Sequence, residues 1–278
     1  MPELPEVETI CWRLRHGGHG ETALVGLTVM AVHLPDPCVV VGDVGDLVDA
    51  LTGAQVTAVW RRAKWIVLDL ARAHGATATV LIHLKMTGDV HVRAAATAAP
   101  RFVRLAADLD DGSVLAFTDP RRFGHVALCV DLEAAFQDLG PEPLDDAFTP
   151  LVLRQRLRGR RPIKSTLLDQ SVVAGLGNIY ADESLWWARV HPHTRTDTLS
   201  DDDVVNLHRS IRHALRASIT ASKDELAWRY QNRGAPSPFQ VYDRGGEPCL
   251  RCGAPLATTT VAGRTTVLCP TCQALPAV

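Results

Sequence analysis

The sequence predicts a two-domain α+β protein in which one helix and a β-sandwich precede a helical domain that ends in a zinc finger. Three observations favour this fold. Short apolar runs with turn-rich borders fill residues 27 to 130, apolar residues recur at helical spacing after residue 150, and two Cys-x-x-Cys pairs lie near the end. A chain of 278 residues is long enough for about two domains, each with its own core.

The first segment, from Pro2 to about Arg15, is expected to form a helix. Its apolar residues share one face, namely Val7, Ile10, Cys11 and Leu14. A glycine-rich stretch, residues 17 to 20, then ends the helix.

Eight runs rich in Val, Leu, Ile and Ala follow and are predicted as strands. Their lengths and the turn residues between them are typical of a β-sandwich, with one helix near Val44–Leu51. The runs are Leu27–Leu34, Gln55–Trp60, Trp65–Leu70, Thr79–Leu84, Val90–Val92, Phe102–Leu109, Val114–Phe117 and His125–Val130.

A break at Gly140-Pro141-Glu142-Pro143 marks a linker between the two domains. A short helix is expected before it, and four helices after it. These are Asp131–Leu139, then Leu151–Leu157, Ile163–Asp169, Asn178–Ala188 and Ser200 to about Ala221. We therefore predict an N-terminal domain over residues 1–135, a linker over 136–149, a helical domain over 150–240 and a zinc finger over 241–278.

The four cysteines Cys249, Cys252, Cys269 and Cys272 have the spacing of a zinc site built on two knuckles, with sixteen residues between the pairs. Four thiolates fill a tetrahedral Zn²⁺ and leave no open position for water, so one structural zinc is expected. Between the pairs, Thr258–Thr260 and Thr265–Leu268 are predicted as two strands, which places Arg264 at the hairpin tip. A rigidly held arginine there is suited to bind a phosphate, although such an arginine can also be merely solvated.

The composition indicates a soluble globular protein. No apolar run is long enough to span a bilayer and no signal peptide begins the chain, so we expect a cytosolic protein without membrane association. The net charge of −2 gives no support to nucleic-acid binding. Basic residues are nevertheless clustered, at residues 61–64, 121–122, 154–164 and 229–233, which is compatible with one basic face.

The beginning of the chain has the composition of an active site. Removal of Met1 would leave Pro2 with a free secondary amine, which is partly unprotonated at neutral pH and can attack a sugar C1′ to form an iminium. The carboxylates of Glu3 and Glu6 follow at helical spacing. The alternative is an ordinary helix start in which the acids favour the helix dipole.

Two glycines, Gly175 and Gly177, precede a predicted helix whose N-cap would be Asn178. The exposed N–H groups of such a start can bind a phosphate, with Lys164 as the cationic partner. The alternative is a capped helix without a ligand.

Together these segments resemble the formamidopyrimidine-DNA glycosylase family, bifunctional base-excision enzymes related to endonuclease VIII. The resemblance runs the length of the chain. The residues that carry it, besides the zinc finger, are Pro2–Glu8, Arg61–Lys64, His83–Gly88, Thr118–Gly124, Leu139–Pro143 and Gly175–Ala181.

The resemblance implies that Pro2 attacks C1′ of a damaged nucleotide while Glu3 serves as acid and base. It further implies that Glu6 positions water or the amine, and that Lys64 lies by the phosphates and assists elimination. Base removal, then β- and δ-elimination, would cut the strand on both sides of an oxidised purine such as 8-oxoguanine or a formamidopyrimidine.

The resemblance also assigns the DNA contacts. Met86, Arg121 and Phe123 would fill the space that the extruded base leaves, with Arg121 bonded to the orphaned cytosine. By residue type alone Met86 and Phe123 would be core residues. Further DNA contacts are implied for Arg160, Lys164, Asn178 of a helix-two-turn-helix, and Arg264 of the zinc finger.

Three features depart from the family pattern. Lys85 replaces a frequent glycine, Arg101 and Arg104 stand where a phosphate-binding histidine is expected, and the segment Trp228–Phe239 differs from the usual loop over the extruded purine. We expect a monomer that binds double-stranded DNA containing damaged bases in the groove between its domains, in the bacterial cytosol. The alternatives are an endonuclease VIII-like enzyme for oxidised pyrimidines and a non-catalytic DNA-binding module.

Overall fold

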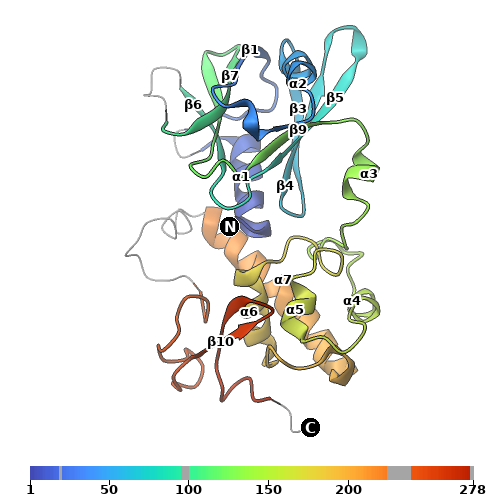
Figure 1. Cartoon of the computed structure of the whole chain (residues 1–278), viewed down its shortest axis with the longest axis vertical. Coiled ribbons are helices and arrows are strands. Elements are labelled where there is room, and N and C mark those ends of the chain that lie inside the picture. The colour runs from blue at the N-terminus through green and yellow to red at the C-terminus, as the bar shows by residue number, and fades with distance from the viewer. Residues whose placement is uncertain (19–20, 95–99, 224–238, 276–278) are drawn as a thin grey trace. The chain divides into compact units, whose positions relative to one another are not determined.

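The computed structural model describes residues 1–18, 21–94, 100–223 and 239–275 (Figure 1). The chain forms two compact units, which divide its first residues between them. One unit contains Met1–Pro2 and Glu6–Gln137, and the other contains Glu3–Pro5 and Asp138–Val278. Because the catalytic candidates Pro2 and Glu3 are adjacent in sequence, the backbone itself joins the two units at this point.

The first unit holds two β-sheets, which confirms the predicted sandwich (Figure 1). The antiparallel four-stranded sheet has the order β1 (Val29–His33), β7 (Val103–Leu109), β8 (Ser113–Thr118) and β6 (Asp89–Ala94). The five-stranded sheet has the order β2 (Val40–Val41), β9 (His125–Cys129), β5 (Thr77–His83), β4 (Trp65–Ala71) and β3 (Gln55–Arg62). Only its β2–β9 pair is parallel among the described strands.

One hydrophobic core joins both sheets of this unit with the helix α1 (Leu4–His16). The alternating apolar residues of the strands point into it, as the period of two predicts. The apolar face predicted for α1 is buried, namely Val7, Ile10, Cys11 and Leu14. The helix begins at Leu4 and not at Pro2, because Glu3–Pro5 pack with the second unit.

Shorter elements complete the first unit. They are the helices α2 (Val44–Leu51) and α3 (Leu132–Phe136) and the 3-10 turns η1 (Pro37–Val39) and η2 (Ala73–Gly75). The helix α3 is shorter than the predicted Asp131–Leu139. Asp131 is its N-cap, where the carboxylate accepts the Ala134 N–H at 3.0 Å, and the helix ends at Phe136.

The second unit consists of helices followed by a two-stranded hairpin (Figure 1). Its elements are α4 (Pro150–Arg156), α5 (Ile163–Leu167), α6 (Asn178–Ala188), η3 (Thr196–Thr198), α7 (Asp201–Lys223), β10 (Ala257–Val261) and β11 (Arg264–Leu268). The predicted capping box before α7 is present, since Ser200 and Asp203 exchange hydrogen bonds at 2.9 and 3.1 Å. No helix among the described residues is both long and apolar enough to cross a bilayer.

The helix α6 lies at the centre of the second unit, and most of its residues are buried, charged ones included. Glu183 accepts hydrogen bonds from the backbone N–H groups of Gln240, Val241 and Tyr242 at 2.9 to 3.0 Å. Burial raises the pKa of Glu183, and these three donors oppose that shift. The segment that leads into the cysteine motif is thereby fixed to α6.

Candidate active site

The Glu3 carboxylate lies at the N-terminus of α6. Its two oxygens accept hydrogen bonds from the backbone N–H groups of Gly177, Ile179 and Tyr180 at 2.8, 3.0 and 3.2 Å. Glu3 is 2% exposed. The first N–H groups of a helix have no partner within the helix and carry its partial positive charge, so a carboxylate is a favourable ligand for them.

The predicted phosphate site at this helix start is therefore wrong, because Glu3 occupies the N–H groups that a phosphate would need. Asn178 is also not the N-cap. Gly177 holds that position without a side-chain cap, and Asn178 is the first residue of the helix. The capping group comes from 174 residues earlier in the chain.

The glycines are needed for the close approach of the chain start. A Cβ atom on Gly177 would overlap the carboxylate of Glu3, and a Cβ on Gly175 would lie 2.7 Å from Leu4 Cδ1. Gly175 also has a φ of +85°, which favours glycine, and its carbonyl accepts the Leu4 N–H at 3.1 Å. Gln170 completes the turn by accepting the Gly175 N–H at 3.0 Å and donating to the Leu176 carbonyl at 2.7 Å.

Lys164 is buried, with 0% of its side chain exposed. Its ammonium lies 2.7 Å from Asp182, and it donates to Thr266 Oγ1 at 2.7 Å and to the Thr265 carbonyl at 3.0 Å. Burial lowers the pKa of Lys164, whereas the negative charges of Asp182 and Glu3 oppose this shift. Burial likewise raises the pKa of Asp182 to about 6, against the effect of Lys164.

This geometry corrects the prediction that Lys164 contacts a phosphate. An enclosed ammonium that already has three partners cannot reach a phosphate at the surface, because the burial that fixes it also separates it from solvent. Lys164 instead connects α5, α6 and β11. Asn178 reaches the same strand, since its Nδ2 donates to the Thr265 carbonyl at 2.9 Å.

The predicted hairpin is present, and Arg264 is exposed at the start of β11. The two residues of its turn, Ala262 and Gly263, both have positive φ (50° and 72°), as a tight two-residue turn requires. The hydrogen bonds from Lys164 and Asn178 to Thr265 hold the hairpin one residue beyond Arg264. Arg264 thus extends from a strand that is fixed to the N-terminal half of α6.

The four predicted cysteine ligands converge. The Sγ atoms of Cys249, Cys252, Cys269 and Cys272 all lie within 4.8 Å of one another. Ligands at the usual Zn–S length of about 2.3 Å lie a little under 4 Å apart in a tetrahedron, so the cluster fits one zinc ion. Backbone N–H groups also point at the sulfurs, from Arg251 to Cys249 at 3.5 Å and from Cys272 to Cys269 at 3.3 Å.

In the first unit, the buried carboxylate of Asp119 organises two loops. Its Oδ1 accepts from Thr87 Oγ1 at 2.5 Å and from the Arg121 N–H at 3.1 Å. Its Oδ2 accepts the N–H groups of Phe123 and Gly124, both at 2.7 Å. Burial acts to raise the pKa of Asp119, but these hydrogen bonds lower it below its ordinary value.

The three residues predicted to fill the space of the extruded base belong to the loops that Asp119 organises. Met86 lies next to Thr87 in the first loop, and Arg121 and Phe123 lie in the second. Met86 and Phe123 are 40% and 48% exposed, so the alternative that they are core residues is wrong. Arg121 is exposed too, and its guanidinium lies 4.7 Å from the centre of the Phe123 ring. An apolar and a cationic side chain thus project together from one fixed loop.

Two of the residues that depart from the family pattern, Lys85 and Arg104, have defined structural roles. Lys85 has a φ of 52°, in the region where glycine is favoured, and its N–H donates to His83 Nδ1 at 3.0 Å. Burial lowers the pKa of His83 to about 3, in keeping with a neutral ring that accepts this bond. Arg104 donates to Asp36 at 3.0 Å and to the Asp119 carbonyl at 2.8 Å, so it supports the Asp119 loop.

The remaining candidates have the following places in the fold. Pro2 and Glu6 are half-buried at the start of α1, in the first unit. Lys64 is buried, in the two-residue turn between β3 and β4. Arg160 is 81% exposed and lies 3.4 Å from Asp197. Of the segment Trp228–Phe239, only Phe239 is among the described residues, buried against Tyr180 and Tyr242.

Three family models match the chain in order. They describe the formamidopyrimidine-DNA glycosylase N-terminal domain (residues 1–126), the formamidopyrimidine-DNA glycosylase H2TH domain (139–229) and a zinc finger found in FPG and IleRS (246–275). A curated formamidopyrimidine-DNA glycosylase from Chloroflexus aurantiacus is 42% identical over 280 residues and covers 98% of each chain.

The chain belongs to the formamidopyrimidine-DNA glycosylase family.

Solved structures of this family share the whole fold. A Lactococcus lactis enzyme bound non-covalently to DNA with an AP site is 32% identical, with a TM-score of 0.85 over 98% of this chain and 99% of that one. The Lactococcus lactis enzyme in a complex with DNA containing Fapy-dG has a TM-score of 0.84 at 32% identity, over 98% of this chain and 100% of that one.

Sequence reasoning missed three positioning residues of this glycosylase fold, namely Asp119, Gln170 and Asp182. Asp119 falls inside the motif Thr118–Gly124 quoted for the family, Asp182 directly follows Gly175–Ala181, and Gln170 lies five residues before it. No local pattern marks these residues, because each acts through partners that only the fold brings close.

Replacement of one zinc ligand should release the metal. We expect Cys252→Ser to lose the single zinc equivalent and to weaken DNA binding, because the hairpin that carries Arg264 is built on the cysteine cluster. Elemental analysis and a DNA titration measure both effects, with Cys129→Ser, outside the cluster, as the control. Full zinc content in Cys252→Ser would contradict the four-thiolate site.

Removal of the Asp119 carboxylate should destabilise the first unit. Asp119→Ala leaves buried donors unpaired, at about 1 to 3 kcal/mol each, so we expect a loss of about 3 kcal/mol or more in urea unfolding. Folding lowers the pKa of Asp119, so its contribution to stability is fully present above pH 3.8, the ordinary pKa of the group. The contribution disappears as the pH falls through the lowered pKa of the folded state.

The control for this measurement is Asp111→Ala, since Asp111 is exposed and, among the described residues, its carboxylate accepts hydrogen bonds only from Ser113. Its expected cost is about 1 kcal/mol. Equal losses in the two variants would show that Asp119 does not organise the loops.

Proposed function

We propose that this protein is a base-excision DNA glycosylase with AP lyase activity that removes oxidised purines, 8-oxoguanine and formamidopyrimidines, from double-stranded DNA. The observation that carries the proposal is the Glu3 carboxylate bound by three backbone donors of α6. It fixes the residue next to Pro2 and places a negative charge beside the proposed nucleophile. Related proteins from Lactococcus lactis bound to Fapy-dG and AP-site DNA support the substrate class.

The reaction begins with removal of Met1, since an acylated Pro2 nitrogen has no free lone pair. The Pro2 amine then attacks C1′ of the damaged nucleotide, the C1′–N bond to the base breaks, and opening of the sugar ring gives an iminium between C1′ and Pro2. Loss of a C2′ proton expels the 3′-phosphate, and loss of a C4′ proton then expels the 5′-phosphate. Water hydrolyses the remaining iminium, which releases the sugar fragment as an aldehyde and frees Pro2.

Glu3 supports this sequence electrostatically. Donors aimed at the carboxylate favour its ionised form, and an anion with almost no solvent contact stabilises the cationic iminium strongly. The carboxylate also serves as acid and base at the sugar. Glu6 positions water or the amine, and Lys64 assists elimination near the phosphates.

Lys164 acts as a positioning residue. It holds β11 through Thr265 and Thr266, and its charge balances Asp182 close to Glu3. Arg264, Arg160 and Asn178 supply phosphate contacts, for which Asn178 has one amide hydrogen beyond that donated to Thr265.

Met86, Arg121 and Phe123 stabilise the extruded state of the nucleotide. Two exposed apolar side chains on fixed loops are suited to fill the vacated stack, and Arg121 bonds the orphaned cytosine. The chain acts as a monomer on chromosomal DNA, in the cytosol of a bacterium like those of its curated relatives.

Borohydride trapping tests the nucleophile and the lesion class together. Protein carrying a removable N-terminal extension should give no covalent adduct with an 8-oxoguanine duplex, whereas cleavage that makes Pro2 the first residue should restore the adduct. The same protein before and after cleavage is the matched control. An equally rapid adduct with the extension in place would eliminate Pro2 as nucleophile, and faster trapping on a thymine glycol duplex would favour the endonuclease VIII-like alternative.

A further inference from the structure

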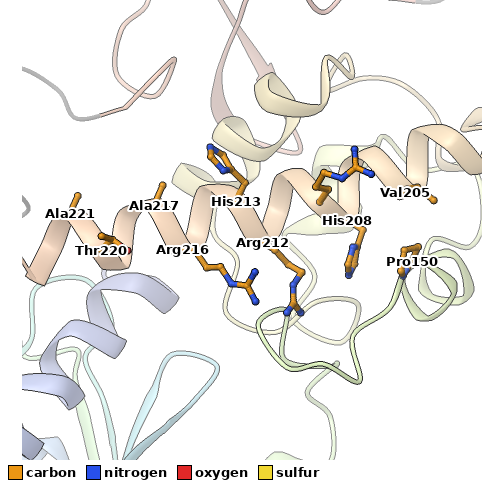
Figure 2. A pocket seen from close by; sticks show the side chains of 10 residues that line it. Pro150, Val205, His208, Arg212, His213, Arg216, Ala217, Thr220 and Ala221 are labelled. Atoms are coloured by element: carbon orange, nitrogen blue, oxygen red, sulfur yellow. The ribbon is translucent and has the colours of Figure 1, made fainter.

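A basic groove of about 800 Å³ lies on the second unit, and none of its lining residues is assigned above to catalysis or DNA contact. It is lined by Pro150 and by the face of α7 between Val205 and Ala221, which we call the α7 groove (Figure 2). Figure 2 shows His213 and Ala217 along one border of this face and His208, Arg212 and Arg216 along the other.

The lining of the α7 groove carries positive charge and no carboxylate. Arg209, Arg212 and Arg216 line it together with two histidines. The guanidinium of Arg212 is already held by the carbonyls of Pro143 and Asp145, at 3.0 and 2.6 Å.

Arg209 and Arg216 are free to bind a ligand. Both are exposed, and within the described part of the chain neither has a hydrogen bond or an ion pair. The groove therefore offers two available guanidinium groups, a geometry that suits carboxylate or phosphate.

The floor between these charges is apolar. Val205 is 39% exposed, Ala217 is exposed, and Ala221 and Pro150 extend the same surface. Protein–DNA interfaces are polar and strongly positive, and a phosphate backbone gains nothing from an apolar floor. A partner that carries both carboxylates and apolar side chains can contact the arginines and the apolar floor at once.

The spacing of the charges matches a helical ligand. Arg209 and Arg216 are seven residues apart on α7, which is two turns or about 10.5 Å along the axis. Carboxylates at positions i and i+7 of a second helix have the same separation, and its residues i+3 and i+4 then face the floor.

We propose that the α7 groove is a docking site for an acidic amphipathic helix of another protein. Arg209 and Arg216 bind its carboxylates, and Val205 and Ala217 contact its apolar residues. The groove shares no residue with the proposed catalytic and DNA-contact set, so docking there does not require a change in the glycosylase reaction.

A labelled model peptide tests the site. The probe is a fluorescein-labelled helix of about four turns with Glu at i and i+7 and Leu at i+3 and i+4, followed by anisotropy with the full-length protein. We expect saturable binding that weakens about tenfold in Arg209→Glu/Arg216→Glu, because attraction becomes repulsion. Arg72→Glu/Arg189→Glu, which reverses two other exposed arginines, should bind as the unaltered protein does.

Excision of 8-oxoguanine should be unchanged in both double variants. If the charge reversals impair folding, Arg209→Gln/Arg216→Gln replaces them, with a smaller expected loss of peptide affinity. Equal binding of a peptide with Lys in place of Glu, or unaltered affinity in the groove variant, would overturn the proposal. So would a parallel loss of lesion-DNA affinity, which would make the groove a nucleic-acid surface.

Discussion

The interaction on which the rest of the site depends is the Glu3 carboxylate at the N-terminus of α6. It satisfies backbone N–H groups that the helix itself leaves unpaired, and it joins the first residues of the chain to a turn 174 residues later. Each charged hydrogen bond of this kind contributes about 1.5 to 3 kcal/mol, so the three together are a large share of a typical domain stability. They also fix the position of the peptide that precedes the proposed nucleophile.

Buried carboxylates with dedicated donors recur throughout the molecule. Glu3 anchors the chain start, Glu183 the segment before the cysteines, Asp182 the hairpin strand and Asp119 the two exposed loops. A carboxylate accepts several hydrogen bonds at once, which makes it suited to fix irregular backbone that no sheet or helix supports. Several functional side chains lie within a few residues of the segments that these acids anchor, namely Pro2 beside Glu3, Met86 beside Thr87, and Arg264 three residues before Val267. The buried acids therefore help to determine where these side chains project.

Much of the fold follows from local patterns. Periodicity predicted the sandwich and the helix Asn178–Ala188, the Ser200–Asp203 pair predicted the start of α7, and the cysteine spacing predicted the metal cluster. The missed contacts are long-range. A glycine turn before a helix predicts a phosphate site as well as a docked carboxylate, and only the fold brings Glu3 there. For the same reason, the sequence predicts Lys164 to be an exposed cation, because only the packing of the folded chain identifies Asp182 as its partner.

The most direct test of the central claim is the single-turnover rate of 8-oxoguanine excision by Gly177→Ala. An added Cβ would overlap the Glu3 carboxylate and displace it from α6. Since small displacements in an active site cost about 100-fold in rate, we predict a fall of that order with zinc content and melting cooperativity retained. Gly112→Ala is the control: its added Cβ meets open space but strains a backbone with a φ of +79°, so it should lower stability and still excise at the normal rate. Normal excision by Gly177→Ala would contradict the account.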